Sequence, residues 1–407
     1  MLGRVVVGFM RSPGVRPTVV IGACGIGLGH VGRMLPVARR LAGRGYGVVF
    51  TSYGDAVGFC LRENFLTYRE SSISYGVRED GSVSLKQTFK GAPRLLKAFS
   101  DQVEAELAVM KKHKPRVVVS DSRLSTLLAA RILGIPSILV MHEFKLMLPL
   151  DVNKLPGLSV LKQIVERVVL ETFGIGWDLA NVVLITDYPA PYTVSKYNVV
   201  IPEFLRHKAE FVGTVGSARG ALSKWDARRL LGLEGSPVVY FGLSGLPEER
   251  RALFDRLFPL AKGVSGLGYT VLLSKGEPNG STRPVRSGRV TVYEWLPDRS
   301  LGYAAADVFV SVGGQTSIGE AMKYGLPMIV VPTPNHTEHD VIAESVSMMG
   351  LGYRIRVGEL TFERFAGALT SIMRDGYVER AAQVAEKLKH YDAISRIVDK
   401  VEEFLVD

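Results

Sequence analysis

The stretch that decides the fold runs from Asp307 to Gly352, DVFVSVGGQTSIGEAMKYGLPMIVVPTPNHTEHDVIAESVSMMGLG. Its pattern predicts a buried strand (Val308–Val312), a glycine turn and then a helix. After the stop Gly325-Leu-Pro327 it predicts a second strand (Met328–Val331), followed by a polar loop (Asn335–Asp340). A strand, a helix and a second strand in this order form one unit of a parallel sheet.

The turn and the start of this helix have the composition of a phosphate site. The five residues concerned are Gly313, Gly314, Gln315, Thr316 and Ser317. Glycines let the backbone approach a phosphate, and a helix N-terminus offers free N–H groups and a positive dipole end. Glu320 follows one turn later, where its carboxylate can accept hydrogen bonds from ribose hydroxyls. The stretch therefore predicts a nucleotide-diphosphate site; the alternative is an ordinary strand–helix–strand unit with a capped helix.

These residues resemble the donor-nucleotide signature of GT-B glycosyltransferases. The matching positions are Ser311, Gly313, Gly314, Ser317, Glu320, Ala321, Gly325, Pro327, Pro332 and Glu338. Two positions differ, because Val312 stands where the family has His and His339 stands where it has Gln. In the family, the acid and the Gln bind the donor's sugar. The resemblance thus implies that Glu338 and His339 contact the sugar, and the change at His339 leaves its identity open.

A second glycine-rich stretch, Gly22–Arg33, joins a predicted strand (Thr18–Ala23) to a predicted helix (Val31–Arg44). It contains the dinucleotide pattern G-x-G-x-x-G. However, the acid expected at the end of the next strand (Gly47–Thr51) is missing, and Asp55 comes several residues late, which argues against a nicotinamide or flavin site. The longer string G-x-G-L-G-H-x-x-R instead resembles the N-terminal loop of GT-B transferases that use lipid acceptors.

This second resemblance implies that His30 lies at the mouth of the cleft, toward the acceptor. An imidazole can take a proton from a hydroxyl near neutral pH. We expect Asp121, which follows the predicted strand Arg116–Ser120, to orient it, because the carboxyl ends of parallel strands meet in one crevice. Alternatively, His30 and Asp121 only cap local structure. The other residues expected on the acceptor side are Gly29, Arg33, His142 and Glu143, of which the last two stay alternatives to Asp121.

Two further segments are expected on the donor side. Gly242-Leu-Ser244-Gly245 follows the predicted strand Val238–Phe241 and corresponds to the family's diphosphate loop, in which Ser244 and Gly245 bind through N–H groups and a hydroxyl. The segment Val292–Pro297 resembles the one beside the base, where we expect Trp295 to pack against the pocket edge. The sequence has no D-x-D and no metal-ligand spacing of His or Cys. We therefore expect no metal and no cofactor, with a UDP-sugar as substrate.

The order of predicted elements gives an α/β fold class. The resemblance to GT-B transferases implies two Rossmann-like domains that face each other across a cleft. The predicted parts are an N-terminal acceptor domain (1–213), a linker (214–235), a C-terminal nucleotide-sugar domain (236–380) and a C-terminal helix (381–407) that crosses back to the first domain.

Charge is unevenly distributed over the 407 residues. Residues 1–213 hold 27 Lys and Arg against 17 Asp and Glu, whereas the remainder holds 23 of each. This asymmetry predicts an anionic partner for the first half. The sequence contains no nucleic-acid-binding motif, so we expect an anionic membrane surface or a lipid-linked acceptor rather than nucleic acid.

Two segments bear on membrane contact. Val83–Lys114 interleaves basic and bulky apolar residues, which fits either an interfacial segment or a solvated basic helix. Leu158–Phe173 repeats apolar residues at helical spacing, and we expect it to pack in the core. No apolar run reaches the ~18–20 residues of a membrane span. The two cysteines, Cys24 and Cys60, are expected to pack in the core and indicate a reducing cytoplasm, with the protein peripheral at the inner face of the membrane.

Together these features predict an inverting, metal-independent glycosyltransferase that moves a sugar from a UDP-sugar to an acceptor hydroxyl or phosphate. Two alternatives remain open: a nucleotide-sugar epimerase of the same fold and a non-catalytic nucleotide-sugar-binding subunit. The sequence does not specify an oligomeric state.

Overall fold

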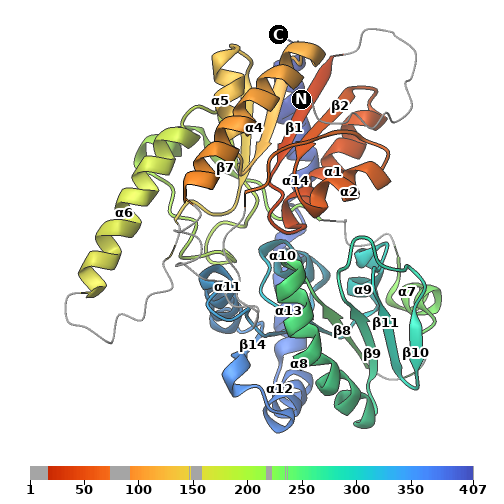
Figure 1. Cartoon of the computed structure of the whole chain (residues 1–407). Helices are drawn as coiled ribbons and strands as arrows, with labels where there is room; N and C mark the ends of the chain where they lie inside the picture. Colours follow the sequence, from red (N-terminus) through yellow and green to blue (C-terminus); the bar gives the residue numbers. More distant parts are fainter. Residues whose placement is uncertain are drawn as a thin grey trace.

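The structure is a computed structural model that describes residues 17–73, 92–145, 147, 158–216, 222–233, 235 and 237–406. Two α/β domains face each other, each built on a seven-stranded sheet (Figure 1). This confirms the predicted GT-B fold class of two parallel-sheet domains.

The first sheet has the strand order β3-β2-β1-β4-β5-β6-β7, and every neighbouring pair is parallel. Its strands are β1 (Thr18–Ala23), β2 (Gly47–Ser52), β3 (Leu66–Arg69), β4 (Val117–Asp121), β5 (Ser137–Met141), β6 (Val182–Ile185) and β7 (Ala209–Phe211). The helices of this half are α1 (Gly29–Gly43), α2 (Asp55–Arg62), α4 (Ala92–His113), α5 (Leu124–Ile132) and α6 (Leu158–Trp177). The central strands are continuous apolar runs because helices cover both faces of the sheet.

The second sheet has the order β10-β11-β9-β8-β12-β13-β14, in which only β10 runs antiparallel to its neighbour. Its strands are β8 (Val238–Gly242), β9 (Thr270–Ser274), β10 (Val285–Ser287), β11 (Val290–Tyr293), β12 (Val308–Ser311), β13 (Met328–Val330) and β14 (Gly352–Arg354). Its helices are α7 (Lys224–Leu231), α8 (Pro247–Gly266), α9 (Arg299–Ala305), α10 (Gln315–Tyr324), α11 (Thr337–Met348), α12 (Phe362–Arg374) and α13 (Tyr377–Leu388).

The C-terminal region, expected to be one helix from residue 381, forms two helices. The first, α13, packs in the core of the second domain, and the last, α14 (Ala393–Val406), packs in the core of the first beside β1 and α1 (Figure 1). The break lies at Asp392, whose carboxylate accepts hydrogen bonds from the backbone N–H and hydroxyl of Ser395. Such a side chain caps the start of a new helix.

The segment expected to be a linker, 214–235, contains the helix α7. Ala227 and Leu231 of this helix are buried in the core of the second domain, and Arg228 bonds Asp307. The described linker is therefore shorter than expected. Its glycines and small residues indicated the connection between the domains, but the apolar residues of α7 at helical spacing complete a domain core.

The expectation that Leu158–Phe173 packs in the core is wrong for most of its apolar residues. Leu161, Ile164 and Val168 of α6 are more than half exposed. Helical spacing identified a continuous apolar stripe, but it could not show on which side of the helix the domain lies. In the other segment considered for membrane contact, residues 83–91 lie outside the described residues, and 92–113 form α4.

The position of α14 makes a testable prediction about stability. Ile397 is fully buried in the core of the first domain. Ile397→Ala removes buried apolar surface and leaves a cavity, so it should lower the free energy of unfolding by about 2–5 kcal/mol in urea denaturation followed by circular dichroism. Ile175→Ala, at a side chain that is 68% exposed, is the matched control. An equal loss in both variants would contradict the assignment of α14 to this core.

Candidate functional site

A cleft of about 700 Å³ lies between the domains, where the carboxyl ends of both sheets meet. Openings of this size at such strand ends are typical of small-ligand sites. Nearly all the predicted site residues line it: Gly29, His30, Arg33, His142, Glu143, Ser244, Gly245, Trp295, Gly314, Gln315, Thr316, Ser317, Glu320, Glu338 and His339. The other two, Asp121 and Gly313, lie behind this lining.

His30 and Asp121 are brought together by the sheet. The register of β1 and β4 pairs Ala23 with Asp121, so the loop after β1 passes beside the end of β4. His30 lies in the first turn of α1, and its Nδ1 is 2.7 Å from Oδ1 of the buried Asp121. Nη2 of Arg33 is 2.9 Å from the same Nδ1, but the closer carboxylate of Asp121 is the acceptor for an Nδ1–H. This leaves Nε2 as the lone-pair nitrogen of the neutral ring.

Arg33 binds the same carboxylate. It is buried one turn after His30, and its Nε and Nη2 lie 2.5 Å from the two oxygens of Asp121. Burial raises the pKa of Asp121, but Arg33 and then His30 outweigh it and lower the value to about 2. Asp121 is therefore ionised at any physiological pH and holds the guanidinium of Arg33 and the imidazole of His30 in place.

Cys24 is the other group that sets the charge of His30. Burial lowers the pKa of His30, but Cys24 and, after the opposing effect of Arg33, Asp121 raise it to about 10. For the thiol of Cys24 the effect of burial is the opposite, because burial raises its pKa. His30 outweighs burial and lowers the pKa of Cys24 to about 7. Each shift is one side of the same attraction between thiolate and imidazolium. The neutral His30 that a base requires is favoured when Cys24 keeps its own proton.

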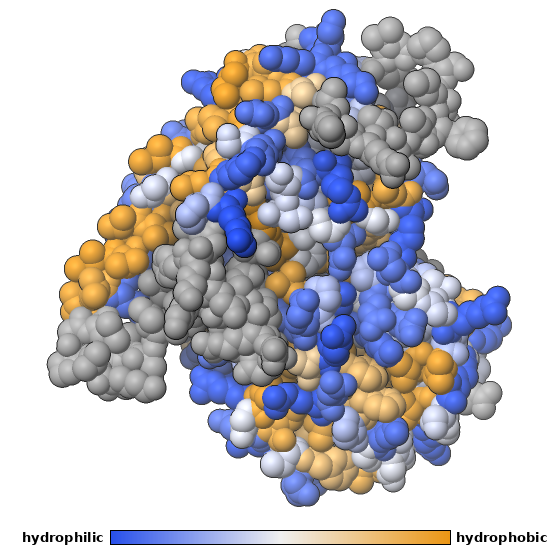
Figure 2. Space-filling view, viewed as in Figure 1, coloured by the Kyte–Doolittle hydropathy of each residue, from blue (hydrophilic) through white to orange (hydrophobic). Residues whose placement is uncertain are grey.

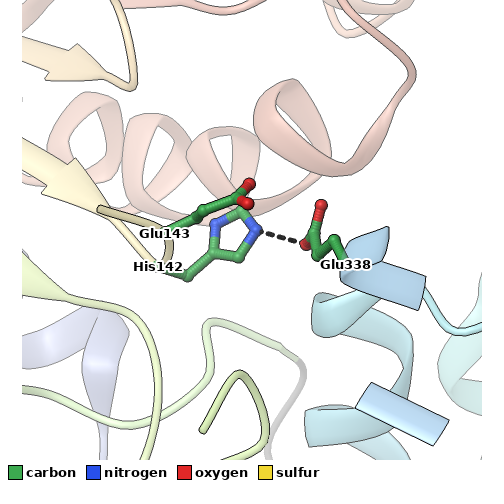
Figure 3. Close-up of side chains that lie close together, drawn as sticks. All are labelled: His142, Glu143 and Glu338. Atoms are coloured by element: carbon green, nitrogen blue, oxygen red, sulfur yellow. Dashed lines mark hydrogen bonds and ion pairs between the residues drawn. The ribbon is translucent and has the colours of Figure 1, made fainter. Parts of the chain in front are cut away.

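Arg33 also extends the cluster to the second domain. Its Nη1 is 2.8 Å from Nδ1 of His142, and Nε2 of His142 is 2.9 Å from Oε1 of Glu338 at the start of α11 (Figure 3). A guanidinium can only donate, so Nδ1 of His142 accepts a hydrogen bond from Arg33. Nε2 of His142 then carries the hydrogen and donates a hydrogen bond to Glu338. Burial and Arg33 both lower the pKa of His142, which keeps the ring neutral.

His142, Glu143 and Glu338 are close enough to suggest a cation site. One ligand atom from each lies within 4.8 Å of the others, and all three converge between the domains (Figure 3). A metal-binding His normally donates its second nitrogen to an acceptor. Here Arg33 occupies Nδ1 as a donor, so Nε2 has no lone pair to offer. The cluster fits a hydrogen-bonded relay and not a metal centre.

Glu143 is the member of this cluster whose neutral form burial favours. Burial and the neighbouring Glu338 raise its pKa well above the usual range of a carboxyl group. Its Oε1 accepts a hydrogen bond of 2.6 Å from Nδ2 of Asn198. Glu143 thus places on the acceptor side of the cleft a carboxyl group whose neutral form is favoured.

The donor side is organised by the N-terminus of α10. No side chain caps this end of the helix, and Gly314, Thr316 and Ser317 all line the cleft. A Cβ on Gly314 would lie 3.2 Å from Oγ of Ser244, so the loop after β8 and the turn before α10 are in close approach. Together they present N–H groups and hydroxyls, which is the arrangement that binds phosphate oxygens.

Glu320 lies one turn further along α10 and is almost fully buried. Its Oε2 is 3.0 Å from Nε of Arg299, the first residue of α9. The pair places a carboxylate and a guanidinium beside the opening of the helix, so a ligand at Glu320 also meets Arg299.

His339 differs from the family pattern and lies deep in the donor side. Its Nδ1 is 3.0 Å from Oγ1 of Thr333, and its ring stacks on His336 at 3.7 Å. Burial and then His336 lower its pKa well below the usual range, so the ring is neutral. Gly313 packs behind it with φ +96°, where a Cβ would lie 2.8 Å from the carbonyl oxygen of His339.

The sequence has detectable relatives of known class. Residues 268–397 match the glycosyltransferase family 28 C-terminal domain. An uncharacterized glycosyltransferase of Methanosarcina acetivorans is 25% identical over 94% of this chain and 98% of its own length. The chain is a glycosyltransferase. The matched part contains α10, Glu320 and His339 of the donor side, whereas Ser244 and Gly245 lie before it.

Two further comparisons extend the likeness of the glycosyltransferase to both domains. The UDP-N-acetylglucosamine–N-acetylmuramyl-(pentapeptide) pyrophosphoryl-undecaprenol N-acetylglucosamine transferase of Caldicellulosiruptor saccharolyticus is 26% identical over 78% of this chain and 80% of its own. The solved structure of the Streptomyces sp. SF2575 glycosyltransferase SsfS6 with thymidine diphosphate has a TM-score of 0.62 at 17% identity, covering 95% of this chain and all of that one. These findings confirm the resemblance stated from the sequence, and the second adds the fold.

Two of the predicted donor residues of the glycosyltransferase make contacts between the domains. Nε2 of Gln315 donates to the carbonyl oxygen of Thr186 at 2.6 Å. The ring of Trp295 meets Phe59 of α2 edge-on at 5.1 Å, with Arg62 over its face. Both residues line the cleft, but these contacts hold the two walls together.

Arg299 and the role of Cys24 were not predicted from the sequence. Arg299 follows β11 at the start of a helix that Asp298 caps, and the rule that strand ends meet at one crevice was enough to propose it. Cys24 was expected only to pack in the core. It follows β1 directly and lines the cleft beside His30, so the same rule applied to it.

The interaction between Cys24 and His30 can be measured. Cys24→Ala removes the anionic partner, so the pKa of His30 should fall from about 10 toward its ordinary value. An NMR titration of the histidine rings would show this as a shift of the His30 transition to lower pH. Cys60→Ala, in the core of the first domain, should leave it unchanged. An unaltered His30 transition in Cys24→Ala would exclude the thiol as its partner.

Proposed function

We propose that this glycosyltransferase transfers a sugar from a UDP-sugar to a hydroxyl or phosphate of a lipid-linked acceptor, with inversion and without a metal. The observation that carries the proposal is the orientation of His30. Its Nδ1 is held by the ionised Asp121, so Nε2 is the nitrogen available to a ligand in the cleft.

The reaction needs one proton transfer and one displacement. Nε2 of His30 takes the proton of the acceptor hydroxyl while its oxygen bonds to the anomeric carbon of the sugar. The bond between that carbon and the β-phosphate oxygen breaks, and UDP leaves with the electron pair. Attack opposite the leaving group inverts the configuration. An acceptor phosphate, already ionised, needs no base.

The leaving diphosphate gains one negative charge, on the oxygen released from the sugar, and the donor side is suited to bind it. The uncapped N-terminus of α10, with Thr316 and Ser317, and the hydroxyl of Ser244 supply N–H and O–H donors. Dipoles that are fixed before the reaction stabilise developing charge without reorganisation. This supports a mechanism in which no cation is required, as does the unsuitable tautomer of His142.

Two observations support the choice of substrates. The relative from Caldicellulosiruptor saccharolyticus is named for UDP-N-acetylglucosamine and an undecaprenol-linked acceptor. Residues 1–213 carry all the excess positive charge, which favours an acceptor with a diphosphate or a location at an anionic surface. We place the enzyme at the cytoplasmic face of the membrane, bound peripherally. In agreement, no helix within the described ranges is long and apolar enough to cross a bilayer.

Measuring UDP release from a panel of UDP-sugars, with and without a membrane lipid extract, tests the proposal. Release that depends on the extract supports the transferase. Interconversion of sugars without acceptor would indicate the epimerase, and UDP binding with neither reaction would indicate a non-catalytic subunit. A product with retained anomeric configuration, determined by NMR, would contradict inversion, and activity lost in EDTA would contradict metal independence.

His30 is the residue on which turnover should depend. His30→Asn removes the proton acceptor, so kcat should fall by about 10²–10⁴-fold. UDP affinity, measured by isothermal titration calorimetry, should be retained because the donor side is intact. His390→Asn, near the start of α14, is the control. Unchanged turnover in His30→Asn would remove this residue as the base.

Glu320 should affect the nucleotide instead. Glu320→Ala removes a carboxylate expected to accept ribose hydrogen bonds, so UDP affinity should fall roughly tenfold or more, as expected for a charge-assisted hydrogen bond. Glu344→Ala changes a partly exposed carboxylate of α11 that pairs with Arg354. This variant should bind UDP normally. Equal affinity in both variants would place the ribose elsewhere.

A further inference from the structure

The helix α6 is apolar on the side that faces away from its domain. Its inward residues are Glu166, Leu170 and Trp177. On the opposite side, Leu161, Ile164, Val168 and Ile175 fall within about 60° of arc at 100° per residue. We call these four residues the α6 stripe; their exposed fractions are 56%, 55%, 59% and 68%. Figure 2 shows the apolar surface along this helix at the edge of the molecule.

The stripe is fixed in its outward orientation by close packing beneath it. A Cβ on Gly174 would lie 3.0 Å from the ring of Phe204, and one on Gly176 would lie 2.7 Å from Leu124. Only glycine allows this approach of α6 to its neighbours. Rotating the helix to bury the stripe would require these contacts to break, so the apolar surface belongs to the folded protein and needs another partner.

A basic hollow adjoins the C-terminal end of the stripe. It has a volume of about 470 Å³ and is lined by Ile175 of the stripe together with Arg131, His207 and Lys208. Asp178 lies in the same wall and pairs with Lys208 at 2.7 Å. Arg131 and His207 are exposed, and because Asp178 is paired with Lys208, Arg131 leaves the hollow with an excess of positive charge.

We propose that this surface docks on an anionic phospholipid bilayer, with the α6 stripe entering the acyl region and the hollow receiving a lipid phosphate. Aliphatic residues beside basic ones are the composition of an interfacial helix. The stripe contains none of the Trp, Tyr or Arg side chains that dominate protein–protein contacts. The net charge of +10 in residues 1–213 adds long-range attraction to an anionic surface.

The position of α6 connects this surface to the reaction. Trp177, on its inward side, lines the cleft together with His142 and Glu143. At this C-terminal end, the cleft and Ile175 of the stripe thus lie on opposite sides of one helix, whose width is about 10 Å. An acceptor anchored by a hydrocarbon chain would reach the acceptor side from the membrane over this distance. That use rests on the proposed function, whereas the docking does not.

Sedimentation of the full-length protein with vesicles tests the docking. One set contains equal parts of phosphatidylcholine and phosphatidylglycerol, and the other contains phosphatidylcholine alone. The double variant Ile164→Gln/Val168→Gln should lower binding to the anionic vesicles by at least about tenfold, because it removes the apolar contact. Leu230→Gln/Leu267→Gln, at residues of similar exposure in the other domain, is the matched control and should bind like the unaltered protein.

Arg131→Gln/His207→Gln separates the hollow from the stripe. It should weaken binding to the anionic vesicles by about fivefold or more, the effect of about one basic residue near an anionic surface, and leave binding to phosphatidylcholine alone unchanged. Full binding by the stripe variant, or an equal loss in the control, would overturn the proposal. A second result would also overturn it: the unaltered protein does not bind vesicles but forms a dimer in analytical ultracentrifugation, and the stripe variant is a monomer. A second copy of the chain would then cover the stripe.

Failure of the proposed function would look different. If no UDP-sugar is turned over, vesicle binding still reports on the docking surface. If the transferase is active, the stripe variant should keep its rate with a water-soluble, short-chain acceptor and lose it only with an acceptor embedded in vesicles. Equal loss with both acceptors would show damage to the cleft and overturn the docking interpretation.

Discussion

The buried ion pair between Arg33 and Asp121 is the interaction on which the site depends. It joins the first helix to the middle of the first sheet, and both partners are almost completely excluded from water. Removing one partner of such a pair leaves an uncompensated charge, at a cost of about 3–5 kcal/mol. Because His30 precedes Arg33 by one turn, the same pair that anchors the helix also sets the position of the imidazole.

The two domains meet through polar and aromatic contacts as well as through the cleft itself. His142 of the first domain bonds Glu338 of the second, and Gln315 of the second bonds the backbone of Thr186 in the first. In this closed arrangement the carboxylate of Glu338 is engaged by protein. A sugar that binds Glu338 must therefore replace or share the bond to His142, so donor binding and the acceptor-side relay are linked.

Much of this architecture was predictable from local sequence patterns. The strand, glycine turn and helix around Gly313 and Gly314 identified the donor side, and the glycine loop before His30 identified the other. Short edge strands such as β7 and β14 were not predicted, because three residues carry too little periodicity. The outward side of α6 and the pairing of Glu320 with Arg299 depend on which surfaces meet in three dimensions, and a single sequence does not state that.

The two chain crossings between the domains touch each other. A Cβ on Gly213, in the first crossing, would lie 2.6 Å from Cβ of Tyr391, in the second. The two connections between the domains thus lie against each other at one place. A rotation of one domain relative to the other would take place about this point. The first crossing continues onto α10, where Thr214 packs on Gly319 and Gly216 on Glu320. Because this crossing contacts the carboxylate that is expected to hold the ribose, a change in the angle between the domains would also displace the groups around the nucleotide.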